Sequence, residues 1–176
     1  MARLLRRVVG SGFVEVWGPV DALPAEQAAA FKKYKALLSK GALAGANPGH
    51  GREVFEKACS SCHKLYGKGG LIGPDITGAN RTNIDYLLGN ILTPSAIIQD
   101  AYRMQMVLMR DGRLYSGIPA VESERVLKLR VANQEKPVAL AKSQIASREI
   151  APVSMMSEGL LANLSDAAVS YTHLRA

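Results

Sequence analysis

Both cysteines of the chain lie in one short stretch, Cys59-Ser60-Ser61-Cys62-His63. The pattern C-x-x-C-H predicts covalent attachment of a c-type haem. The spacing suits this chemistry because each thiol can add to one vinyl group on the same porphyrin edge, while the adjacent imidazole ligates the iron as its proximal ligand. The stretch therefore predicts one covalent haem c, held by Cys59, Cys62 and His63.

Two other uses of a C-x-x-C pair fit the sequence less well. Structural zinc needs four protein ligands, whereas outside the motif the chain has only His50 and His173 and no second cysteine pair. A redox dithiol needs its cysteines at the start of a helix. Residues 51–58 instead have the pattern of a helix that leads into the pair, so haem attachment is the favoured interpretation.

The composition indicates one or two small folded units. Of the 176 residues, 48% are hydrophobic and 21% are charged, which argues against global disorder. The net charge of +7 is spread along the chain. We interpret it as a solvated surface suited to docking an acidic redox partner, and we do not expect nucleic-acid binding. No apolar run approaches the roughly 20 residues of a membrane span.

Hydrophobic periodicity predicts helices on both sides of the motif. We expect them over residues 25–40, 51–60 and 84–92. Pro24 marks the start of the first helix, and Thr82 or Asn83 caps the third. The glycine-rich segment 65–78 lacks the phosphate-loop pattern, and its glycines predict close approach of the backbone to a planar ligand.

From Tyr102 the sequence changes to the alternation typical of strands. Asp111-Gly112 predicts a hairpin turn, and we expect three to five short antiparallel strands over residues 102–150. Ser165 is a suitable N-cap for one more short helix.

The second axial ligand of the iron is left open by the spacing alone. A methionine in this position is typical of electron carriers. Three methionines fall on a predicted strand, where we expect them in the sheet core: Met104, Met106 and Met109. Met155 and Met156 lie in a predicted loop, which suits a ligand that closes over the haem. His50 and His173 are weaker candidates.

Several motifs together resemble a known family. Gly51-Arg52-x-Val54-Phe55-x-Lys57-x-Cys59-x-x-Cys62-His63 and Gly73-Pro74-Asp75-Ile76-Thr77-Gly78 resemble class I c-type cytochromes. The later motifs are more specific: Asn80-Arg81, Asp85-Tyr86-Leu87-Leu88, Asn90-Ile91-Leu92-x-Pro94-Ser95-Ala96, Tyr102, Asp111-Gly112-Arg113 and Ser154-Met155-Met156-Ser157-Glu158-Gly159-Leu160-Leu161. Over about residues 30–166 the set resembles the haem-binding domain at the C-terminus of large exported bacterial dehydrogenase-like proteins, behind β-propeller and helical-repeat regions.

The resemblance implies a role for each of six residues. It implies that Cys59 and Cys62 form thioether bonds to the haem and that His63 is the proximal ligand of the iron. Met156 is the implied distal ligand, with Met155 as the alternative. The Pro74 carbonyl is implied to accept a hydrogen bond from His63 Nδ1, which would fix the ring. Arg81 is placed among the cofactor-binding residues. The family usually has proline after the distal methionine, where this chain has Ser157.

The resemblance also implies the fold. It is a mainly α, cytochrome c-like helical domain with a small antiparallel β insertion before the distal-ligand loop and a truncated last helix. The expected division is an N-terminal helical segment (1–45), a cytochrome c domain (46–101 with 151–168), the β insertion (102–150) and a non-native tail (169–176). Residues 1–22 do not complete a signal peptide, so we expect a piece of a longer exported protein.

The predicted function is transfer of single electrons from an attached or partner dehydrogenase to a downstream acceptor, in the periplasm or otherwise after export. No nucleophile or acid–base constellation is evident, so the isolated chain is not expected to be an enzyme. One alternative is a haem enzyme or gas sensor with an open sixth position, which Ser157 favours. Another is a thiol or metal module that never receives haem.

Overall fold

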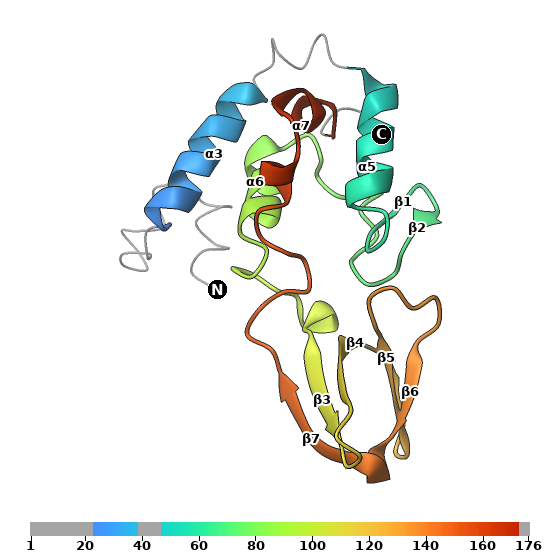
Figure 1. The fold of residues 1–176 in the computed structure, drawn as a ribbon. Helices are drawn as coiled ribbons and strands as arrows, with labels where there is room; N and C mark the ends of the chain where they lie inside the picture. The colour runs from blue at the N-terminus through green and yellow to red at the C-terminus, as the bar shows by residue number, and fades with distance from the viewer. Residues whose placement is uncertain (1–22, 39–46, 173–176) are drawn as a thin grey trace. The chain divides into compact units, whose positions relative to one another are not determined.

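The computed structural model describes residues 23–38 and 47–172, which form two compact units (Figure 1). The first unit comprises the described residues before 56 together with residues 79–97 and 157–172. The second comprises residues 56–78 and 98–156. The expectations about residues 1–22, about the end of the first helix after Leu38 and about the last four residues lie outside the described range.

The first unit is helical. It contains α3 (Ala25–Leu37), most of α5 (Pro48–Ala58), α6 (Ile84–Leu92), the 3-10 helix η3 (Leu160–Asn163) and α7 (Asp166–Thr172). Helix α3 packs against α6 and α7, and two exposed ion pairs, Lys35–Asp85 and Lys33–Asp166, join the same helices. The buried core consists of Tyr34, Leu38, Leu88, Leu92, Leu161 and Val169.

Two predicted helix starts are confirmed in this unit. The side chain of Asn83 accepts a hydrogen bond from the N–H of Tyr86 at 3.0 Å, which resolves the choice between Thr82 and Asn83 as the cap of α6. Ser165 Oγ accepts a hydrogen bond from the N–H of Ala168, as expected of an N-cap. The helix that follows carries Val169, whose side chain is fully buried.

The second unit contains a five-stranded antiparallel sheet in the order β6-β5-β4-β3-β7. Its strands are β3 (Gln105–Met109), β4 (Leu114–Glu122), β5 (Val126–Arg130), β6 (Val138–Ala141) and β7 (Ile145–Ile150). The 3-10 helix η2 (Lys142–Gln144) joins β6 to β7 (Figure 1). The predicted turn at Asp111-Gly112 connects β3 to β4, with Gly112 at φ +85°. Side chains of Val107, Met109, Leu127, Leu129 and Leu140 form the core of the sheet.

The expectation of a mainly α fold is wrong. About a third of the described residues are helical and about a quarter are in strands, and they hold four α-helices beside the five-stranded sheet. The physical reason is that the sheet has a buried core of its own, separate from the helical core, so it is a full structural layer. The five strands fall within the three to five that alternation predicts.

Candidate haem site

The C-x-x-C-H motif continues directly from the last residue of α5. The N–H groups of Cys62 and His63 both donate to the carbonyl oxygen of Cys59, at 3.1 and 2.9 Å. Ser60 Oγ donates to the carbonyl oxygen of Glu56 at 2.6 Å, which ties the motif to the helix. The two cysteines and the histidine are therefore carried on one tight turn, as attachment to a single porphyrin requires.

The environment of the cysteines does not favour a redox dithiol. Burial raises the pKa of the Cys59 thiol, and the neighbouring Cys62 raises it further. The pair also follows the carboxyl end of a helix, where the partial negative charge disfavours a thiolate. Within residues 23–38 and 47–172, no group of three or more His, Cys, Asp or Glu side chains is arranged to hold a metal ion.

The imidazole of His63 is oriented by the backbone. Its Nδ1 lies 3.0 Å from the carbonyl oxygen of Pro74, so the hydrogen bond implied by the resemblance is present. A carbonyl oxygen can only accept, so Nδ1 carries a proton, and in the neutral ring the lone pair lies on Nε2. This tautomer, supported by a carbonyl acceptor, is the form in which histidine ligates a metal through Nε2. The residues present therefore fit a haem iron.

A tight hairpin returns the chain toward the motif. Strands β1 (Lys64–Leu65) and β2 (Lys68–Gly69) pair antiparallel. The two residues between them, Tyr66 and Gly67, have φ of +47° and +82°, the combination that a two-residue hairpin of type I′ requires. The N–H of Tyr66 donates to Thr77 Oγ1 at 2.8 Å, which holds the hairpin against the end of the loop.

The glycines after this hairpin allow close approach to the motif itself. The N–H of Gly70 donates to the Ser60 carbonyl at 2.7 Å, and a Cβ at position 70 would lie 2.1 Å from the Ser61 carbonyl oxygen. A Cβ at Gly73 would lie 2.6 Å from Cε1 of the His63 ring. The sequence predicted close approach to a planar ligand, whereas these glycines contact the haem-binding turn. The motifs alone did not indicate this contact with the turn, although glycine density was its signal.

Only one of the three methionines predicted in the sheet core is there. Met109 is buried in that core, whereas Met106 on β3 is half-buried and Met104 precedes the strand. Met155 and Met156 are half-buried in a segment without regular structure, where the N–H of Met156 donates to Ser154 Oγ at 3.1 Å. Among the histidine candidates, His50 lies in α5 and His173 is outside the described residues.

Five of the six predicted site residues belong to the second unit: Cys59, Cys62, His63, Pro74 and Met156. The structure brings His63 and Pro74 into direct contact. Arg81 belongs to the first unit, in the turn before α6, where its N–H donates to the Ala79 carbonyl at 2.7 Å. The roles of His63, Pro74, Arg81 and Met156 toward a haem stay predictions.

One comparison with known proteins gives a match to part of the chain. The family model described as Cytochrome c matches residues 49–111, from the first turn of α5 to the hairpin after β3. A search of curated proteins gives no match. The family match supports a cytochrome c-type haem-binding domain with a haem-based electron-transfer role. Such a domain implies covalently bound haem c and redox partners, consistent with Cys59 and Cys62 in C-x-x-C-H.

Proposed function

We propose that the chain is a c-type haem module that passes single electrons from an attached or partner dehydrogenase to a downstream acceptor. The observation that carries this proposal is the hydrogen bond between His63 and Pro74 directly beside the two cysteines. It directs Nδ1 to a backbone acceptor and leaves Nε2 as the ring nitrogen that can bind a metal, which is what a proximal ligand needs. When bound, the haem supplies a one-electron couple at its iron.

The chain's residues have distinct tasks in this proposal. Cys59 and Cys62 hold the haem covalently, and His63 binds the iron through Nε2. Met156 is the distal ligand, and a thioether in that position raises the reduction potential. Two observations support Met156: it is half-buried, and it belongs to the same compact unit as the motif. Met155, its neighbour, is the alternative.

Exposed basic residues around the motif support an acidic redox partner. Lys57 and Lys68 are exposed before and after the motif, and both belong to the second unit. Complementary charge increases the association rate of redox partners and makes that rate sensitive to salt. Rates of electron exchange with an acidic partner should therefore fall as ionic strength rises.

We also propose that this exchange takes place in the periplasm or otherwise after export. Cytochrome c domains are typically extracellular or periplasmic, which supports this location. In the part of the chain that the structure describes, no helix is long and apolar enough to cross a membrane.

Optical spectra of the oxidised and reduced chain test the proposed ligands. The chain is exported in a host that attaches c-type haem, and the parent is compared with Met156→Ala and Met155→Ala. We expect the weak near-infrared methionine–iron band in the parent and in Met155→Ala, and its loss in Met156→Ala. The reverse pattern would identify Met155 as the ligand.

One observation favours a second function, a haem enzyme or gas sensor with an open sixth position. The residue after Met156 is the exposed Ser157, which restricts the backbone less than a proline. A parent protein that lacks the methionine–iron band and binds carbon monoxide readily would support this alternative and contradict the electron carrier.

A further inference from the structure

Strand β7 is an edge strand with little apolar packing. Among residues 23–38 and 47–172 its one pairing partner is β3; residues 146–150 are exposed, and Ile145 is the residue of β7 that packs against the sheet core. Pairing register is well specified where one face of a strand is buried and poorly specified where both are exposed. The position of β7 along β3 therefore needs support beyond the hydrophobic core.

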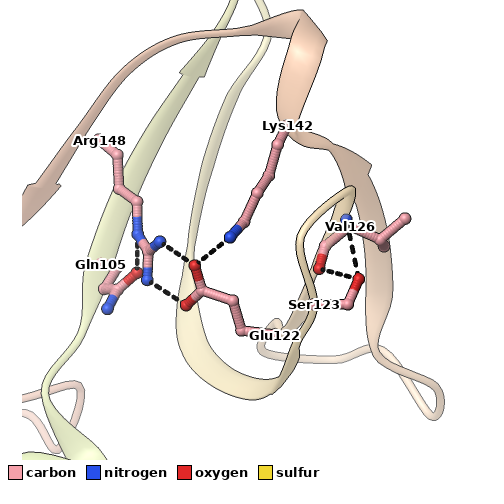
Figure 2. A network of polar contacts seen from close by, with 6 residues as sticks. All are labelled: Gln105, Glu122, Ser123, Val126, Lys142 and Arg148. Atoms are coloured by element: carbon pink, nitrogen blue, oxygen red, sulfur yellow. Dashed lines mark hydrogen bonds and ion pairs between the residues drawn. The ribbon is translucent and has the colours of Figure 1, made fainter.

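Arg148 supplies that support through its side chain. Its Nη1 and Nη2 donate to the two carboxylate oxygens of Glu122, at 2.7 and 2.9 Å, and its Nε donates to Gln105 Oε1. Lys142 Nζ also contacts Glu122, at 2.6 Å. Figure 2 shows the guanidinium of Arg148 between the side chains of Gln105 and Glu122. Two parallel hydrogen bonds from a planar guanidinium fix both the position and the orientation of the group that accepts them. Arg148 therefore ties β7 to β3 and to the end of β4.

The segment that leaves β7 is short and anchored. The N–H of Ala151 donates to the Met104 carbonyl at 2.9 Å, and Ala151 is buried. Pro152 follows and restricts the backbone. The N–H of Met156 then donates a hydrogen bond to Ser154 Oγ. Each residue of a strand advances the chain by about 3.3 Å. A shift of β7 by one residue along β3 would therefore displace the start of this segment by a similar distance.

We propose that Arg148 is a positioning residue for Met156: by fixing the register of β7 on β3, it sets where the methionine loop begins. The inference rests on the proposed function, in which Met156 ligates the haem iron. It assigns to the sheet a task in the haem site that neither the motif nor the family match indicates. Arg148 itself touches neither the ligand nor the iron in this account.

The test compares three variants of the full chain loaded with haem. Arg148→Ala removes all contacts of the fork, and Arg148→Lys keeps the charge but not the bidentate geometry. The matched control is Arg113→Ala, because Arg113 makes an equivalent ion pair with Asp111 in the hairpin between β3 and β4. We expect Arg148→Ala to lose most of the methionine–iron band and to bind carbon monoxide. Arg148→Lys should show a partial loss, and Arg113→Ala should resemble the parent.

Amide hydrogen exchange gives a second readout that does not depend on the iron. In the Arg148 variants the amides of Ala151 and Met156 should exchange at least about tenfold faster than in the parent, while those of β5 remain protected. Uniformly faster exchange over the whole sheet would mean that Arg148 only stabilises the fold, and it would overturn the inference. If Arg148→Ala does not fold, the same comparison is made with Arg148→Lys.

Failure of this inference can be told apart from failure of the proposed function. If Met156→Ala abolishes the band but both Arg148 variants keep the parental band and carbon monoxide response, the positioning role is wrong and the electron carrier stands. If the band survives in Met156→Ala but is lost in Met155→Ala, the inference about Met156 fails and the electron carrier stands with Met155 as its ligand. A parent protein that lacks the band contradicts both proposals.

Discussion

Nδ1 of His63 lies 3.0 Å from the carbonyl oxygen of Pro74, and the residue before that proline, Gly73, lies against the same ring. The imidazole is therefore held on one side by a hydrogen bond and on another by backbone that carries no side chain. Both contacts come from a loop that the hairpin at Tyr66-Gly67 folds back on the motif. The His63 imidazole is thus oriented by the chain itself.

Gly73→Ala should disturb that orientation. The added Cβ would lie 2.6 Å from Cε1 and 2.7 Å from Nδ1 of His63, so the ring or the loop must move. We expect a loss of about 1–3 kcal/mol in the free energy of unfolding, as for other overpacked sites, together with a changed reduction potential. The control is Gly78→Ala, since a Cβ there meets nothing within 4 Å. Equal potentials and equal stabilities in the two variants would show that Gly73 does not constrain the ring.

Asn83→Ala should destabilise the first unit through helix α6. The variant loses the side-chain acceptor for the N–H of Tyr86, and N-cap substitutions of this kind cost about 1 kcal/mol. Urea unfolding followed by circular dichroism measures the change. Thr82→Ala serves as the control, because the hydroxyl of Thr82 donates a hydrogen bond to the side chain of Asn80, which is exposed. A larger loss for Thr82→Ala than for Asn83→Ala would contradict the capping assignment.

How far the sequence predicted the structure depended on how local each signal was. The bounds of α6 and the turn at Asp111-Gly112 were predicted because a cap or a turn is decided by a few adjacent residues. The hydrogen bond between His63 and Pro74 was predicted through the family resemblance. In each case the relevant residues form a short, recognisable pattern.

Contacts between distant residues were not predictable in this way. Arg148 and Glu122 are 26 residues apart, and nothing in either neighbourhood indicates that β7 pairs with β3. The predicted fold class was wrong for a related reason. The helical motifs were recognisable in the sequence, whereas the pairing of all five strands into one sheet was not. The approach of Gly70 and Gly73 to the motif also depends on a hairpin whose turn contains Tyr66 at positive φ, a conformation that tyrosine rarely adopts.

The ion pairs of Glu122 should make stability depend on pH in acid. Hydrogen bonds from Arg148 and Lys142 lower the pKa of Glu122 from 4.5 to about 2. Between these values the unfolded chain binds a proton that the folded chain does not, so the stabilisation is complete above about pH 5 and is lost as the pH falls through about 2. The stability difference between the parent and Glu122→Gln should therefore shrink over that range. A constant difference from neutral pH to about pH 2 would contradict the role of the carboxylate.

Val169→Ala tests whether α7 is an integral part of the helical unit. Val169 is fully buried in the core with Leu88 and Leu161. Removal of two methyl groups and the resulting cavity should lower the free energy of unfolding by about 1–3 kcal/mol. Ala167→Ser, at an exposed position of the same helix, should change it by no more than about 0.5 kcal/mol. Equal stability of the parent and Val169→Ala would place α7 outside the cooperative fold.

Retention of haem by the denatured chain after acidified-acetone extraction shows whether the chain is a c-type haem module. We expect one haem per chain to stay with the polypeptide, because two thioether bonds hold it. The double variant Cys59→Ala, Cys62→Ala should release any haem that it binds. Haem that extracts freely from the parent protein, or a parent that matures without haem, would contradict the assignment of this chain as a c-type haem module.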